Sequence, residues 1–292
     1  AQYIKPIGET TADYMQAADD LITAGNQMII APGFKFDEAI TKLQEQYPDI
    51  KFVMIDGQPE EVAENTIAIY FAEHEAGLLA GITAALETKT GKVGFIGGMK
   101  SESIEKFGYG YVAGVAYANK HFGTNAEVVD YLYNGTFTDV AGGQAQAGSM
   151  YDKGIDIIFT AAGRVGSGVI TEAKTRAEAG DKVYVIGVDV DQYEDGIYNQ
   201  ETNESVILTS ALKRVDNASY TKVDEFINGT FTGGEVITMT AEVDGVGLPE
   251  TNPNLTTETQ ETVNELLANI KAGNLVIPST EADVQSFLSE MG

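Results

Sequence analysis

The sequence predicts an α/β fold in two lobes, with mostly parallel sheets and helices on both faces. Two observations lead to this prediction. Short apolar runs rich in β-branched residues recur along the 292 residues, as expected of strands covered on both faces. Segments of helical periodicity separate these runs, and this alternation is typical of parallel sheets built from βαβ units.

The apolar runs predict at least eight strands before the last 80 residues. These strands are Gln27–Ala31, Lys51–Ile55, Thr66–Phe71, Lys92–Gly97, Ala126–Tyr133, Ile155–Ala161, Lys182–Val188 and Ser205–Ser210. A short apolar run at Leu275–Pro278 predicts one more strand near the end of the chain.

Helical periodicity appears between the strands. Apolar residues at three- and four-residue spacing predict helices around Tyr14–Ile22, Ala39–Leu43, Ala76–Ala85 and Phe107–Ala118, and a last helix over Thr257–Ala272. Right-handed crossovers would place such helices on both faces of a sheet.

Eight strands are too many for one comfortable lobe, so we predict two. The chain is expected to cross between them after Gly97-Gly98, near Thr209–Ala211 and near Gly233–Thr240. Lobe 1 would then comprise residues 1–97 and 210–240, and lobe 2 residues 98–209 and 241–292.

The composition excludes several classes of function. Lys and Arg number 18 against 44 Asp and Glu, for a net charge of −26, which argues against binding nucleic acid or anionic lipid. The absence of Cys excludes disulfides, Cys-ligated metals and thiol catalysis. No apolar run approaches the roughly 20 residues of a membrane span.

Enzyme signatures are absent as well. The sequence contains no G-x-S-x-G, G-x-x-x-x-G-K-[ST] or H-E-x-x-H motif, and the only two histidines, His74 and His121, have no adjacent partner motif. An EF-hand loop starting at Asp189 fails because Glu194 and Gln200 stand where Gly and Glu are needed. We therefore predict no cofactor, no metal site and no catalytic residues.

Candidate binding residues lie in the turns after strands, where ligands bind in open α/β sheets. Asp189 ends an apolar strand, where its carboxylate could accept hydrogen bonds from a polyol or cap a helix. Lys213 follows the strand at Val206–Leu208 and could bind a ligand, pair with Asp189 or be an ordinary surface lysine.

Aromatic and glycine residues in the turns are further candidates. Phe34, Phe36 and Phe137 lie in Gly-flanked segments, where they could stack on a flat ligand or anchor a loop on the core. Gly163-x-x-Gly166-x-Gly168 differs in glycine order from a dinucleotide-binding loop. It favours a close-approach turn at a helix N-terminus.

Taken together, these segments resemble the basic membrane protein (BMP) family of substrate-binding lipoproteins, also called the purine nucleoside receptor A family. The resemblance covers essentially the whole chain in order. It is carried by Ile30–Phe34, Phe71–Gly81, Val93–Met99, Lys106–Val115, Gly135–Asp139, Ala162–Gly168, Val185–Gln192 and Thr209–Lys213.

This resemblance implies a type I periplasmic-binding-protein fold of two Rossmann-like lobes joined by three hinge crossings. It also implies a monomer that captures a nucleoside, expected to be a purine nucleoside, in an interlobe cleft and delivers it to an ABC transporter permease. Such a protein is an extracytoplasmic lipoprotein, periplasmic or at the cell surface, held to the membrane only by an N-terminal lipid anchor that this chain lacks. Alternatives are a sugar, riboflavin-like or autoinducer ligand, a ligand-responsive regulator, or an enzyme acting on nucleosides.

The resemblance also assigns roles to residues. Asp189 and Lys213 would hold the ribose hydroxyls, Gly163 would allow close backbone approach, and Phe137 would stack on the base. Phe34 would form the opposite wall. Arg164 stands where the family more often has a small residue.

The start of the chain departs from the family pattern. The sequence opens at what resembles the family's second strand, Gln2–Pro6, so a central strand of lobe 1 and its ligand-contacting loop are missing. We expect an open pairing edge in this sheet, and a native protein with an additional N-terminal segment of roughly 35–45 residues.

Overall fold

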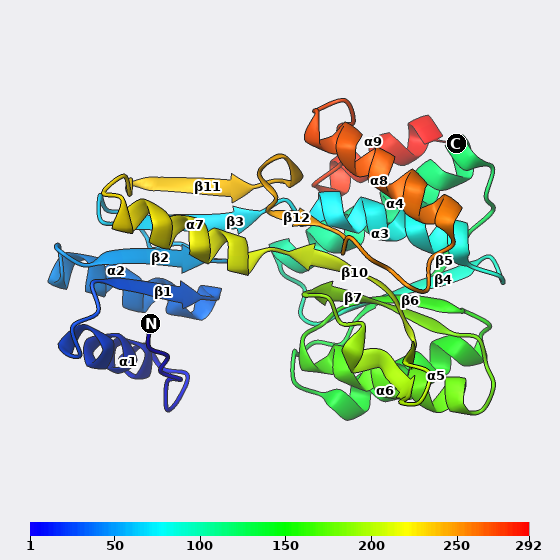
Figure 1. The fold of residues 1–292 in the computed structure, drawn as a ribbon, viewed down its shortest axis with the longest axis horizontal. Coiled ribbons are helices and arrows are strands. Elements are labelled where there is room, and N and C mark those ends of the chain that lie inside the picture. The colour runs from blue at the N-terminus through cyan, green and yellow to red at the C-terminus, as the bar shows by residue number, and fades with distance from the viewer. Residues whose placement is uncertain (292) are drawn as a thin grey trace. The chain divides into compact units, whose positions relative to one another are not determined.

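The computed structural model describes residues 1–291, which form two compact units. Unit 1 comprises Ala1–Phe71 and Val215–Met239, and unit 2 comprises residues 72–214 and 240–291. Each unit has its own sheet, and both sheets are mostly parallel with helices on both faces (Figure 1). The predicted α/β fold is thereby confirmed.

Unit 1 is built on a four-stranded parallel sheet in the order β1-β2-β3-β11. Its strands are β1 (Met28–Pro32), β2 (Lys51–Ile55), β3 (Thr66–Phe71) and β11 (Glu235–Met239). Its helices are α1 (Thr11–Thr23), the 3₁₀ turn η1 (Phe34–Phe36), α2 (Asp37–Gln46) and α7 (Val215–Ile227).

Amphipathic helices close the core of unit 1. One face of α1 and one of α2 pack on β1 and β2, burying Ile40, Leu43 and Phe52 at 1% exposure or less. Helix α7 contacts β2 and covers the opposite face of the sheet (Figure 1). The helices predicted near Tyr14–Ile22 and Ala39–Leu43 are therefore α1 and α2.

The segment Gln2–Pro6, which resembles the family's second strand, does not form a strand. Residues Gln2–Pro6 carry no strand pairing, and Tyr3 is 85% exposed. Among residues 1–291, β1 pairs only with β2, so β1 is an edge of this sheet, as expected. Gln2–Pro6 stays irregular because a strand forms only against a hydrogen-bonding neighbour.

Unit 2 contains a six-stranded sheet in the order β12-β10-β7-β6-β4-β5, parallel except for the β12–β10 pair. Its strands are β4 (Lys92–Gly97), β5 (Glu127–Tyr133), β6 (Ile157–Ala161), β7 (Tyr184–Asp189), β10 (Ile207–Lys213) and β12 (Val246–Gly247), beside a hairpin of β8 (Ile197–Asn199) and β9 (Glu204–Ser205). Its helices are α3 (Glu73–Glu87), α4 (Glu102–Phe122), α5 (Val140–Asp152), α6 (Arg164–Glu178), α8 (Thr257–Lys271) and α9 (Glu281–Met291), with 3₁₀ turns η2 (Glu194–Gly196) and η3 (Ala241–Val243).

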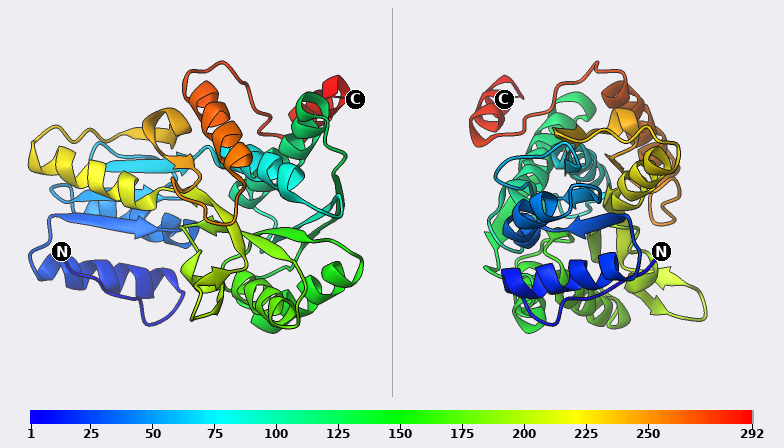
Figure 2. Two further views of the ribbon diagram at one scale, coloured as in Figure 1. Left: turned by 45° about the vertical axis from the view of Figure 1, so that its right-hand side comes forward. Right: turned by 90° about the vertical axis from the view of Figure 1, so that its left-hand side faces the viewer.

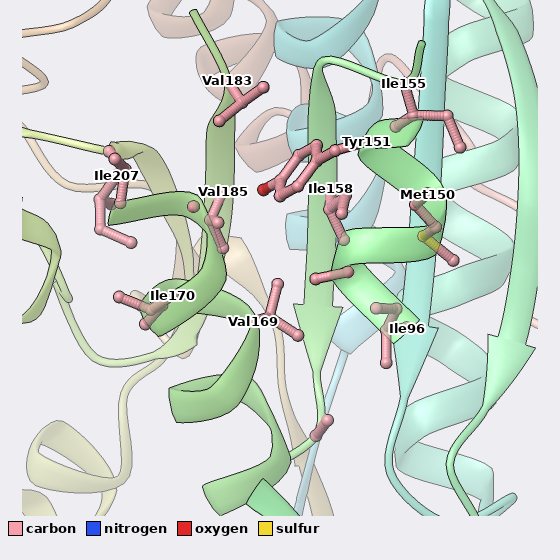
Figure 3. Close-up of a cluster of buried hydrophobic side chains, with 14 of the residues drawn as sticks. Ile96, Met150, Tyr151, Ile155, Ile158, Val169, Ile170, Val183, Val185 and Ile207 are labelled. Carbon is pink, nitrogen blue, oxygen red and sulfur yellow. The ribbon is translucent and has the colours of Figure 1, made fainter. Parts of the chain in front are cut away.

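Helices form a layer on each face of the unit 2 sheet (Figure 2), and successive residues of a strand face opposite layers. Ile96 and Ile158 belong to a cluster with α5 and α6, which Figure 3 shows. Their neighbours Phe95 and Phe159 turn to the other face, where both rings contact Tyr111 of α4. Both faces are therefore buried, which explains the continuous apolar runs.

Glycines let α3 and α4 pack backbone against backbone. A Cβ on Gly81 of α3 would overlap the Tyr111 carbonyl and lie 3.0 Å from the Val115 nitrogen. A Cβ on Gly114 of α4 would overlap the Leu78 carbonyl. The buried helix α3 thereby becomes a core element of unit 2.

This arrangement corrects two predictions. Strand β4 pairs with β5 and β6, so it belongs to unit 2, and the first crossing lies after Phe71 rather than after residue 97. The third crossing, after Met239, lies within the predicted range Gly233–Thr240, and the second, after Arg214, lies three residues beyond the predicted Thr209–Ala211. Leu275–Pro278 is not a strand, and its Val276 is 85% exposed. An apolar run does not reveal which sheet, if any, it will join.

The structure contains, within residues 1–291, no helix that combines the length and apolar character needed to cross a membrane.

Candidate functional site

Asp189 and Lys213 end two neighbouring strands of unit 2. Asp189 is the last residue of β7 and Lys213 the last residue of β10. In the parallel register Asp189 pairs with Leu212, so Lys213 lies one position further along. Strand pairing therefore brings the two candidate residues to adjacent strand ends.

The backbone at Asp189 is in an unusual conformation. Its φ is +67°, and the Val190 N–H donates to the Val188 carbonyl at 2.8 Å, which closes a three-residue turn around Asp189. A turn of this kind is rare and strained for a non-glycine residue, and such strain concentrates at functional sites. The next helical turn, η2, begins only at Glu194. Asp189, whose side chain is exposed, is thus not a helix N-cap.

Gly163 follows the next strand of the sheet, β6, and precedes α6. Its φ of +57° and ψ of −128° lie in a region that only glycine adopts readily. Arg164 is exposed, and its backbone N–H donates to the Phe137 carbonyl at 3.0 Å. The start of α6 is therefore tied to the loop that carries Phe137.

Phe137 lies in the loop after β5, the edge strand. This loop folds back over β4, where the Gly135 N–H donates to the Gly98 carbonyl at 2.9 Å. The half-buried Phe137 ring lies against Gly98, since a Cβ on Gly98 would overlap the ring. A Cβ on Gly163 would lie 3.6 Å from the same ring. Gly98 was named only at an expected crossing between the lobes, and its contact with Phe137 was not predicted.

Four of the five predicted site residues therefore share one edge of the unit 2 sheet. Because the carboxyl ends of parallel strands point the same way, this edge carries Lys213, Asp189, Gly163 and Phe137 in the order of their strands. We call these four residues the strand-end site.

Phe34, the fifth predicted residue, belongs to unit 1. It follows β1 in η1 and is 51% exposed. Asp56 directly follows the adjacent strand β2 and has a φ of +59°, which repeats the positive φ of Asp189. Asp56 was not among the predicted site residues, although an Asp-Gly pair directly after an apolar run marks it in the sequence.

Asp37, at the start of α2, lies beside this turn. A Cβ on Gly57 would overlap its Oδ1 atom. Burial raises the pKa of Asp37 to about 6, against a backbone hydrogen bond from Gln58 that lowers it. This carboxyl thus changes charge nearer neutral pH than an ordinary aspartate.

A surface groove of about 740 Å³ lies on α5 and α6, away from the predicted residues. Its lining includes Gln144, Asp152 and Glu172, and these polar groups already have partners. Glu172 accepts hydrogen bonds from Gln144 and Arg176, and Asp152 pairs with Arg176 at 2.7 Å. The groove offers small residues and satisfied charges, so it is a weaker candidate for the site than the strand ends.

No group of three or more His, Asp or Glu in residues 1–291 is arranged to hold a metal ion. The carboxylates after Asp189 serve the loop instead: Asp191 accepts the Tyr193 N–H at 3.0 Å, and Asp195 accepts the Gln192 side-chain amide at 3.2 Å. His121 stacks on Tyr117 at 4.1 Å.

Comparison with known proteins identifies the family. The model of the Bmp family, described as ABC transporter substrate-binding protein PnrA-like, matches residues 2–281. The chain belongs to this family.

Several Bmp relatives resemble the chain over most of its length. The "CD4+ T-cell-stimulating antigen" of Listeria monocytogenes is 35% identical over 91% of this chain and 74% of its own. The "ABC transporter nucleoside-binding protein BmpA" of Lactococcus lactis is 34% identical, with 92% and 76% covered. "Basic membrane protein B" of Borreliella burgdorferi is 33% identical, with 96% and 77% covered.

Solved structures show the same fold. A solute-binding protein of an ABC transporter system from Aeropyrum pernix superposes with a TM-score of 0.77 at 26% identity, covering 97% of this chain and 86% of its own. A transcriptional activator of the comK gene from Bacillus halodurans gives a TM-score of 0.76 at 22% identity, covering 92% and 86%. The second likeness shows the fold alone.

The Bmp protein described here is therefore a substrate-binding protein of an ABC transporter, with the type I periplasmic-binding-protein fold. The family binds substrates rather than converting them, and its members act outside the cytoplasm. A small-molecule ligand and a transporter are its implied partners.

Proposed function

We propose that this Bmp protein captures a nucleoside, and specifically a purine nucleoside, for import. The observation that carries the proposal is the strand-end site. It places an acid, a base, a glycine turn and an aromatic ring along one edge of a single sheet.

Each group of the site suits one part of a nucleoside. The Asp189 carboxylate can accept hydrogen bonds from two ribose hydroxyls, and the Lys213 ammonium can donate to one. Hydrogen bonds with a charged partner are the stronger kind. The half-buried ring of Phe137 offers an apolar face to a flat base.

Two parts of the proposal concern both units. Phe34 is proposed as a second aromatic contact, and the ligand is proposed to bind in a cleft between the lobes. Both rest on the family resemblance, together with the exposure of Phe34 after β1.

We propose further that the protein acts as a monomer, anchored to the cell membrane by lipid, and delivers its ligand to a permease. The name of the Lactococcus relative, a nucleoside-binding protein, supports the choice of ligand. The net charge of −26 suits a soluble receptor for a small neutral molecule.

Calorimetric titration with inosine, guanosine, adenosine and uridine tests the proposal. We expect the purine nucleosides to bind, and Lys213→Met to weaken binding. Lys182→Met is the matched control, because Lys182 is exposed and precedes β7 at its opposite end. Loss of affinity in Lys213→Met but not in the control would support the proposed site.

Other ligands and reactions are separate outcomes of the same experiment. If a pyranose or riboflavin binds while none of the four nucleosides does, the proposed ligand class is wrong. The strand-end site is then tested again with that ligand and the Lys213→Met variant. Chromatography that detects free base after incubation with inosine would instead indicate an enzyme.

A further inference from the structure

We propose that Gln192 is a positioning residue that holds Asp189 in its ligand-binding conformation. This inference rests on the proposed function, in which Asp189 accepts hydrogen bonds from the ligand. Gln192 lies three residues after Asp189, in the loop that follows β7.

The Gln192 side chain forms a hydrogen bond with the first residue of the strained turn, and we call this bond the brace. Its Oε1 atom accepts the Val188 N–H at 3.0 Å, directly before Asp189. Val188 in turn accepts the Val190 N–H through its carbonyl. Both polar groups of Val188 are thus committed to holding the turn, and Gln192 supplies one of the two bonds.

The Gln192 backbone is fixed to the neighbouring strand. Its N–H donates at 3.1 Å to Oγ of Ser210, a fully buried residue of β10. Lys213 ends the same strand three residues later. One residue therefore joins the turn of Asp189 to the strand that carries Lys213.

Gly187 makes room for this brace. A Cβ there would lie 2.6 Å from Gln192 Oε1 and 2.8 Å from Ser210 Oγ. Any side chain at position 187 would push the glutamine away from the strand. The absence of a side chain on Gly187 is thus a condition for the contact between Gln192 and Val188.

The rest of the loop has its own anchors. The Tyr193 N–H donates to Asp191 Oδ1, and its carbonyl accepts the Ser205 hydroxyl at 2.7 Å. The Val206 N–H donates to the Gly196 carbonyl at 3.0 Å. A change in the Gln192 side chain should therefore release the turn at Asp189 without unfolding the loop.

The physical effect is preorganisation. A positive φ at a non-glycine residue persists only when surrounding contacts impose it. Without the brace, Asp189 would relax to other backbone conformations, and binding would have to restore the competent one. The apparent affinity is then the intrinsic affinity multiplied by the fraction of molecules in which Asp189 has the binding conformation.

The test uses inosine titrations of the full chain. Gln192→Met keeps the volume and removes the acceptor for the Val188 N–H, and we expect inosine affinity to fall about tenfold. Asp195→Ala is the control, because it removes only the partner of the glutamine nitrogen. It should leave affinity unchanged.

A double-mutant cycle separates positioning from general stability. If Gln192 acts through Asp189, Gln192→Met should have little further effect in an Asp189→Asn background. The urea midpoint of Gln192→Met should fall modestly, because the Val188 N–H loses its acceptor, so affinities are compared without denaturant, where both proteins are folded. Equal losses of affinity in both backgrounds would overturn the positioning role.

Two failures remain distinguishable. If the wild type binds inosine and Gln192→Met binds it equally well, the positioning role falls while the proposed function stands. If the wild type binds none of the four nucleosides, the proposed function falls and takes the role of Gln192 with it.

Discussion

Asp189 and Lys213 are 24 positions apart in the sequence but end neighbouring parallel strands, because Asp189 pairs with Leu212 across the β7–β10 ladder. An acid and a base at adjacent strand ends form the polar half of the strand-end site. Phe137 and Gly163 extend it along the same edge.

The first prediction concerns Asp189. Asp189→Asn should weaken inosine binding at least about 30-fold, or about 2 kcal/mol, since a hydrogen bond to a charged group is lost. Calorimetry measures this change. Asp181→Asn removes the same charge from an exposed position before β7 and should bind as the wild type does. Unchanged affinity in Asp189→Asn would remove this residue from the site.

The second prediction concerns the contact between Gly98 and Phe137. Gly98→Ala should displace the Phe137 ring, because the added Cβ would overlap it. Phe137→Leu should lose about 1–3 kcal/mol of binding free energy, the range for stacking a base on an aromatic ring. Fluorescence or calorimetric titration with guanosine would measure both effects.

The control for this pair is Phe122→Leu, which alters a phenylalanine 42% exposed at the end of α4. Guanosine affinity should not change in this control. A Gly98→Ala variant with the affinity of the wild type would show that the position of the ring does not matter for binding.

The third prediction concerns the packing of α3 on α4. Gly81→Ala should lower the free energy of unfolding by about 1–3 kcal/mol, since overpacking forces the two backbones apart. Urea denaturation measures this loss. In the control Gly148→Ala, the nearest atom to the new Cβ is the flexible Glu172 carboxylate at 3.3 Å. Helix propensity should make this change neutral or stabilising.

The fourth prediction concerns His74 and pH. Burial, together with a smaller contribution from nearby Lys106, lowers the pKa of His74 to about 4. Its Nδ1 has no hydrogen-bond partner within residues 1–291. Below about pH 6.5, His74 binds a proton in the unfolded state but not in the folded state. The contribution of His74 to the free energy of unfolding is therefore complete above that pH and is lost as the pH falls toward 4.

The loss from this histidine amounts to about 3 kcal/mol. Urea midpoints at pH 7.5 and 4.5 should show a smaller drop in His74→Gln than in the wild type. His121→Gln, which changes the other histidine, should retain the drop of the wild type. Equal drops in all three proteins would exclude His74 as the titrating group.

Sequence patterns located most of the elements. Continuous apolar runs predicted β4, β6 and β7, and helical spacing predicted α3, α4 and α8, because burial on both faces or along one stripe leaves a direct record in residue order. The strand expected at Leu275–Pro278 was wrong, since a short apolar run does not specify a partner.

The boundary between the units was harder to predict. Strand β4 was assigned to the first lobe by its position in the chain, whereas its hydrogen bonds place it between β5 and β6. Hydrogen-bond partners distant in sequence decide membership of a sheet, and no local pattern encodes them.

The sequence by itself determined the fold class, the family and the residue types at the strand ends. Only the tertiary structure decided that Asp189 and Lys213 lie side by side, that Asp189 adopts a positive φ, and that Phe137 lies against Gly98. Gln192 became visible as a brace only through its bonds to Val188 and Ser210. The reason is physical: periodicity follows from burial along one element, whereas register, turn strain and ring contacts arise from interactions between elements.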